Sequence, residues 1–159
     1  MNPTESARIN FQIAARYRAS VKPTPLRRAA LATLEHQRVE GSVELTIVIT
    51  GDAQLRALNR EFRQIDAPTD VLSFSIDGQT EVKQRRRYLG DVIISYMTAR
   101  SQAKAGGHPI EAELQLLVVH GVLHLLGHDH DTRSEKAKMW QAQAQILKRI
   151  GSAITGPKE

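Results

Sequence analysis

The chain contains no cysteine and few aromatic residues. Among its 159 residues, aromatic side chains make up only 4%. The absence of cysteine excludes a disulfide framework and any zinc site built from thiolates, and it fits a reducing compartment. The shortage of aromatic residues means that leucine, isoleucine, valine and alanine must build the core. A chain of this length is sufficient for one domain and short for two.

The sequence also lacks a long uninterrupted apolar run. Met1 to Asn10 holds mostly polar residues, where a signal peptide would carry an apolar stretch. The most apolar segment, Ile110 to Leu126, is interrupted by two histidines and is too short for a clean membrane span. We therefore expect a cytoplasmic protein that has no membrane partner.

Positive charge exceeds negative charge along the chain. There are 22 lysine and arginine residues against 17 acidic residues, which gives a formal net charge of +5. Such an excess favours a polyanionic partner, although charge alone does not establish nucleic-acid binding. Arg85, Arg86 and Arg87 form a basic run at the end of a polar loop predicted at 77–87. This run is a candidate RNA contact, and a solvated loop is the alternative.

Apolar periodicity divides the chain into strands and helices in the order βαβαββααα. The predicted strands are 9–17, 43–50, 70–75 and 89–95, and the predicted helices are 26–37, 52–62, 96–105, 109–126 and 132–148. This order predicts a single α+β domain over residues 1–159, in which a small mixed β-sheet is packed with about five helices. We expect the strand at 43–50 to be central and the tails at 1–7 and 151–159 to fray.

Three histidines near the end of the predicted apolar helix have metal-ligand spacing. His120 and His124 are four residues apart, so both imidazoles lie on one helix face. Gly127 provides a helix stop, and the turn that follows can bring His130 to the same ion. Three protein ligands leave one position open, as in catalytic zinc sites. We expect one Zn²⁺ there, although imidazole also suits other divalent transition metals.

The residue after the first histidine limits the reactions that this site can catalyse. Metzincin peptidases share this spacing and carry glutamate there as the general base, whereas this chain has Gly121. The missing carboxylate argues against peptide hydrolysis. Three neutral imidazoles leave a bound ion its full charge, which suits a phosphodiester substrate. A metallopeptidase and a non-catalytic, ribosome-associated RNA-binding factor with a structural metal are the alternatives.

Four ordered segments resemble the YbeY family of metal-dependent endoribonucleases. They are residues 58–63, 66–74, 89–95 and 120–130. The resemblance implies a zincin-like metal helix, an ion on His120, His124 and His130, and hydrolysis of single-stranded RNA. It further implies a role with the small ribosomal subunit, in maturation of the 3′ end of 16S ribosomal RNA and in ribosome quality control. His128 departs from the tyrosine of many members, and Ser75 from a common proline.

The resemblance also singles out Arg63 as catalytic, beside His120. The residues alone favour a solvated arginine that offsets a helix dipole, but with the resemblance we expect Arg63 to hold a phosphate oxygen. His128 and Asp129 are candidates to support the metal ligands from behind, together with Asp70 and Asp91. Each aspartate has a local turn or cap role as the alternative. His128 leaves a ligand swap with His130 open, and we favour His130.

Overall fold

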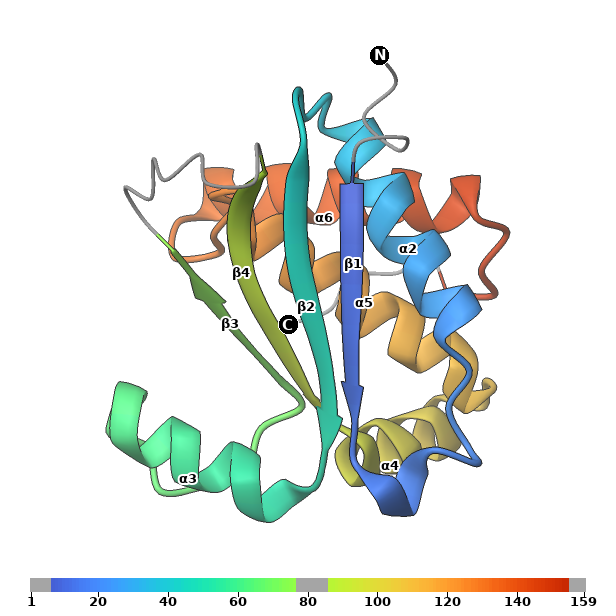
Figure 1. Ribbon diagram of the computed structural model, residues 1–159, viewed down its shortest axis with the longest axis vertical. Helices are drawn as coiled ribbons and strands as arrows, with labels where there is room; N and C mark the ends of the chain where they lie inside the picture. Colours follow the sequence, from blue (N-terminus) through green and yellow to red (C-terminus); the bar gives the residue numbers. More distant parts are fainter. Residues whose placement is uncertain (1–6, 77–85, 155–159) are drawn as a thin grey trace.

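The computed structural model describes residues 7–76 and 86–154, which form one α+β unit around a four-stranded sheet (Figure 1). The strands are β1 (Ala7–Ile13), β2 (Val43–Thr50), β3 (Val71–Ser75) and β4 (Arg87–Ser95). The α-helices of the described residues are α2 (Pro23–His36), α3 (Asp52–Arg63), α4 (Tyr96–Gly106), α5 (Ile110–Leu125) and α6 (Arg133–Arg149). The predicted fold class, with a mixed sheet and five helices, is confirmed.

The sheet has the strand order β1-β2-β4-β3. Strands β1, β2 and β4 are parallel, whereas β3 pairs with β4 in the antiparallel direction and forms one edge. Strand β2 lies inside the sheet, as expected from its apolar alternation. The edge position of β3 matters for function, because its free side faces the histidine cluster described below.

Two element boundaries differ by more than two residues from those predicted. The first strand ends at Ile13 instead of residue 17, because Ala15–Tyr17 forms the 3₁₀ turn η1. Tyr17 still points inward there and stacks on Tyr96 with ring centroids 4.5 Å apart, which explains why it continued the apolar alternation. Helix α2 begins at Pro23, three residues before the predicted start, since proline is compatible with the first helical turn.

The described residues include a part of each predicted tail. Ala7 is the first residue of β1 and pairs with Val43. After α6, the Ser152 N–H donates to the Leu147 carbonyl, and Ile154 packs against the core. Residues 1–6 and 155–159 lie outside the described residues. None of the helices formed by the described residues has the length and apolar character that crossing a membrane requires.

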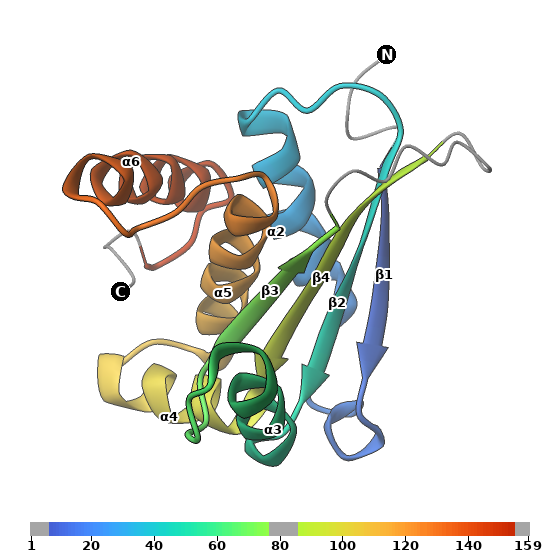
Figure 2. The same ribbon diagram turned by 90° about the vertical axis from the view of Figure 1, so that its left-hand side faces the viewer.

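Helices cover the two faces of the sheet unequally. Helices α2, α5 and α6 lie on one face, with α5 in the middle, as Figure 2 shows. Val92 and Ile94 of β4 belong to the large apolar cluster on that side, whereas Ile93 points the other way and packs with Leu55 of α3 and Leu72. Helix α5 is therefore the central helix, and its last two turns carry the functional site.

Candidate metal centre and active site

Helix α5 approaches the sheet closely at Gly121. A Cβ atom at this position would lie 2.5 Å from Val92 Cγ1 and 3.1 Å from the Ser73 hydroxyl oxygen. That hydroxyl donates to the Gly121 carbonyl at 3.0 Å, which ties edge strand β3 to the helix. Only a glycine permits this approach without a shift of its neighbours. The neighbouring side of the helix carries His120 and His124, which line a cavity together with Ser73; His120 also contacts Gln143 of α6.

The imidazoles of His120 and His124 are held in matching orientations. His120 Nδ1 lies 3.1 Å from Gln143 Oε1 on α6, and His124 Nδ1 lies 2.9 Å from the His128 carbonyl oxygen. Both partners are acceptors, so each Nδ1 must carry the proton and donate it. Each neutral ring then presents an unprotonated Nε2. These two Nε2 atoms face each other at 3.1 Å.

Two lone pairs at this separation repel each other unless a cation lies between them. Tetrahedral zinc with bonds of about 2.0 to 2.1 Å places its nitrogen ligands about 3.3 Å apart. The observed 3.1 Å is close to that value. His130, from the turn between α5 and α6, completes a group whose ligand atoms lie within 4.8 Å of one another. The donor set therefore fits a divalent metal ion.

Burial keeps the helix-borne ligands neutral. Burial and, as the next cause, the nearby His124 together lower the pKa of His120 to about 4. Burial also lowers the pKa of His124, with His130 as the next cause. Imidazole binds metal only when it is neutral, so protons compete weakly with an ion at these two residues near neutral pH.

Gln143 was not among the residues predicted from the sequence. Its side chain is fully buried, and its Oε1 accepts from His120 while its Nε2 is among the buried side-chain atoms of the described residues that have no hydrogen-bond partner. A buried amide whose NH₂ group has no hydrogen-bond partner lowers the stability of the fold. We therefore infer that Gln143 serves to orient His120. Helical spacing from the buried Met139 and Ile146 could have shown that Gln143 faces inward.

A cavity of about 570 Å³ opens in front of the histidines. Arg63 lines it from the last residue of α3, and Asp70 and Ser73 line it from the β3 side. Gln64, with φ of 58°, ends α3 in the left-handed conformation, and the Asn59 amide donates to the Ala67 carbonyl at 2.9 Å. These contacts fix the loop after α3. Arg63 and the histidine cluster thus share one cavity.

The other candidate residues lie at different distances from this cavity. Asp70 and Asp129 line it, and the charge of Asp70 acts to raise the pKa of His120. Asp129 accepts from the His130 N–H at 2.7 Å. His128 turns its imidazole away, to Gln37 at 2.7 Å, and contributes its carbonyl to His124.

Asp91 does not belong to the residues that line the cavity. It precedes Val92 on β4 and therefore points to the opposite sheet face, where the Tyr88 hydroxyl donates to it. Asp91 therefore points away from the histidines that it was expected to support.

Arg86 and Arg87 are the described residues of the basic run. Arg87 begins β4, and its N–H donates to the Ser42 carbonyl. Neither Arg86 nor Arg87 is among the residues that line the metal cavity. Arg85 lies outside the described residues. Arg86 and Arg87 therefore lie at the start of β4, at the opposite end of this strand from Ser95.

The fold and the site together define a single-domain α+β protein with a three-histidine cluster at the end of its central helix. The chain belongs to the Endoribonuclease YbeY family, whose family model matches residues 12–151. It is 42% identical over 152 residues to "Endoribonuclease YbeY" of Roseiflexus castenholzii, with 93% of this chain and 96% of the relative covered. A Chloroflexus aurantiacus protein of the same name is 45% identical over 129 residues, with 78% and 84% covered.

A solved structure shows the same fold. The solution structure of TM1509 from Thermotoga maritima matches with a TM-score of 0.59 and 23% sequence identity. The match covers 91% of this chain and 88% of the other. At this identity the likeness concerns the fold alone, and it agrees with the mixed sheet and five helices described above.

Proposed function

We propose that this protein is a metal-dependent endoribonuclease that hydrolyses phosphodiester bonds of single-stranded RNA. The observation that carries the proposal is the pair of unprotonated Nε2 atoms of His120 and His124, which converge at 3.1 Å in the cavity that Arg63 also lines. Membership of the Endoribonuclease YbeY family supports RNA as the substrate. The net charge of +5 agrees with a polyanion.

We infer that the ion is Zn²⁺, held by His120, His124 and His130 with one position open for water or substrate. A divalent ion at such a site supplies Lewis-acid chemistry, which lowers the pKa of water and stabilises negative charge on phosphate oxygens. The protein's own contribution is to keep the imidazoles neutral and oriented. Gln143 and the His128 carbonyl do so from the side of the rings away from the ion.

Arg63 and the aspartates complete the proposed site. The guanidinium of Arg63 donates to nonbridging phosphate oxygens and places the scissile phosphate in front of the histidines. Asp70 and Asp129 lie in the same cavity, where either carboxylate is placed to accept a proton from water. Their negative charge also repels phosphate, so Arg63 has to orient the substrate as well as attract it.

Membership of the Endoribonuclease YbeY family supports a proposal for the biological substrate. We propose ribosomal RNA, with the small ribosomal subunit as partner and maturation of the 3′ end of 16S ribosomal RNA as the reaction, in the cytoplasm. A role in ribosome quality control is consistent with the same activity. Arg86 and Arg87 offer a second RNA contact at the far end of β4.

Peptide hydrolysis is the weaker candidate. Even the Cβ atom of a glutamate at position 121 would lie 2.5 Å from Val92 Cγ1, so α5 would have to shift away from β4 to admit this side chain. The usual general base of a histidine-motif peptidase therefore has no room in this fold.

The first arm of the test asks whether RNA cleavage requires the metal. It compares wild type with His124→Ala and measures both the zinc content and the cleavage of a single-stranded RNA. His124→Ala should lose the ion and at least about a thousandfold in rate, because a ligand and the orientation of its neighbour are removed together. His108→Gln is the matched control, since His108 contacts Glu113 away from the cluster. Full cleavage by an ion-free variant would exclude the proposal.

The second arm tests Arg63. Arg63→Ala should retain the ion and lose about a hundredfold in kcat, the scale found for removal of one charge-stabilising donor. Arg60→Ala is the control, because Arg60 lies one turn earlier on α3 and near Asp66 at 4.0 Å. Equal rates for the two arginine variants would remove Arg63 from the mechanism. Analysis of the product ends then distinguishes attack by water from attack by a ribose 2′-hydroxyl.

A further inference from the structure

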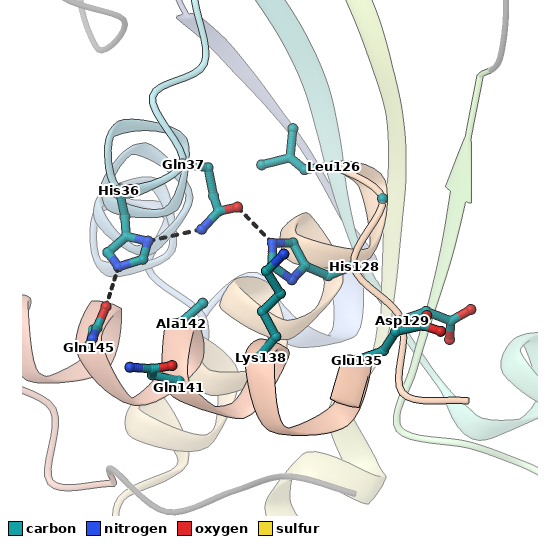
Figure 3. Close-up of a pocket in the computed structure, with 11 residues that line it drawn as sticks. His36, Gln37, Leu126, His128, Asp129, Glu135, Lys138, Gln141, Ala142 and Gln145 are labelled. Atoms are coloured by element: carbon teal, nitrogen blue, oxygen red, sulfur yellow. Dashed lines mark hydrogen bonds between the residues drawn. The ribbon is translucent and has the colours of Figure 1, made fainter. Parts of the chain in front are cut away.

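A second cavity lies beside the metal cavity, at the place where α2, α6 and the end of α5 meet. Its volume is about 560 Å³, within the range of small-ligand sites. Gly127, His128 and Asp129 line both cavities, so only this short segment separates them. Figure 3 shows His36 and Gln37 on one side of the second cavity and residues of α6 on the other.

A directed chain of hydrogen bonds lines this second cavity. His128 Nε2 lies 2.7 Å from Gln37 Oε1, which can only accept, so the His128 N–H donates. The Gln37 amide then donates to His36 Nδ1 at 2.9 Å, and His36 Nε2 donates to Gln145 Oε1 at 2.7 Å (Figure 3). Each group has one defined role, and the chain joins the segment after α5 to both α2 and α6.

The remaining groups suit a base more than a phosphate. Lys138 is the cation among the residues that line the cavity, and Glu135 and Asp129 contribute carboxylates. The neutral amides and imidazoles outnumber the charges, and Gln141 adds another amide at the rim. Amides carry both donors and acceptors, as do the edges of nucleobases. A phosphate would instead need a surplus of cations.

His128 connects the two cavities physically. Its imidazole donates into the second cavity, while its own carbonyl accepts the proton of His124 Nδ1 at 2.9 Å. A ligand in the second cavity therefore contacts the same residue that orients a metal-facing imidazole. Single-stranded RNA that places a phosphate before the histidines has its neighbouring nucleotide within reach of the shared segment.

We propose that this second cavity is a nucleobase subsite, which receives the base of a nucleotide that flanks the scissile phosphate. The inference rests on the proposed endoribonuclease function and adds to it a source of sequence preference. Gln37, Gln145 and His128 supply the polar groups that contact the base edge, and the exposed Lys138, which also lines the cavity, supplies a cation for the RNA backbone.

The test uses a series of short single-stranded RNAs that are identical except for one abasic nucleotide, moved along the chain. Binding is measured with metal-free wild-type protein, so the readout does not depend on cleavage. One abasic position should raise Kd about tenfold, the scale of one lost set of base contacts. In the double variant Gln37→Met/Gln145→Met, this penalty should fall below about twofold. Gln12→Met, an exposed glutamine on β1, is the control and should retain it.

The double variant also needs a structural check, because Gln37 holds His128. Its zinc content and thermal stability should match those of wild type, which shows that the metal site is intact. An abasic penalty that is the same at every position, or that survives in the double variant, overturns the subsite. Failure of the endoribonuclease proposal gives a different result, since the metal-loaded wild type then cleaves none of these RNAs whatever the binding pattern.

Discussion

Two sides of helix α5 differ in how tightly they are packed, within a single turn. On the side toward the sheet, Gly121 has no space for even one added carbon, because Val92 and Ser73 fill it. On the other side, His120 and His124 keep their Nε2 atoms facing an open cavity and one another. The close packing at Gly121 fixes the distance between the helix and the sheet. This fixed distance also positions the two histidines on the open side. The metal geometry therefore depends on a packing contact that touches no metal ligand.

The largest expected effect comes from filling the tight side. Gly121→Glu restores the sequence pattern of the histidine-motif peptidases, and it should destabilise the protein by about 3 kcal/mol or more, through overpacking and burial of a carboxylate. Chemical denaturation measures the loss. No peptidase activity should appear, because admitting this side chain displaces α5 from β4 and moves His120 and His124 with it.

Gly121→Ala is the smaller version of that change and allows a compensation test. The added carbon meets Val92 Cγ1, which Val92→Ala removes. Gly121→Ala should therefore cost less stability when it is introduced into the Val92→Ala variant than when it is introduced into wild type. If the double variant instead loses as much stability as the two single variants lose together, the contact between residue 121 and Val92 does not limit the size of the side chain at residue 121.

A smaller effect is expected on the open side, behind the ligands. Gln143→Leu removes the acceptor of His120 Nδ1 and should weaken zinc affinity about 10- to 100-fold, the usual range for loss of such a partner. Competitive zinc titration measures it. Gln115→Leu is the matched control, since Gln115 is also buried in this protein but donates to the Pro25 carbonyl. Equal zinc affinities for these two variants would contradict the role of Gln143.

The smallest effect is expected at His128. Its imidazole faces Gln37, and only its main chain contacts His124, so His128→Tyr should change zinc affinity by no more than about threefold. His130→Ala should reduce the affinity far more, because it removes a member of the cluster. The opposite ranking of these two variants would mean that the histidines exchange roles and that His128 binds the ion.

The histidine cluster was accessible to sequence reasoning because its determinants are local. Helical periodicity places His120 and His124 on one face, and Gly127, with φ of 96°, ends the helix where the spacing predicted. The fold class and the central position of β2 followed from apolar patterning in the same way. Arg63 drew attention through family resemblance, since an arginine at a helix end has no distinctive local signature.

What the sequence could not show depends on contacts between distant segments. The order β1-β2-β4-β3 is set by pairing across the chain, and no local pattern encodes it. Asp91 was a candidate to support the metal ligands, with a local cap or turn role as the alternative, yet the alternation of β4 points it to the other sheet face, toward Tyr88. Gln143 and the packing role of Gly121 become visible only when α5 lies against α6 and the sheet.

The central claim is that RNA cleavage requires one ion on the histidine cluster. The most direct test titrates zinc into metal-free protein and measures bound ion and RNA cleavage in the same samples. We predict that the cleavage rate rises in proportion to bound zinc and levels off at about one ion per chain, as three convergent ligands with an open position require. Cleavage at the full rate before any ion is bound would contradict this account.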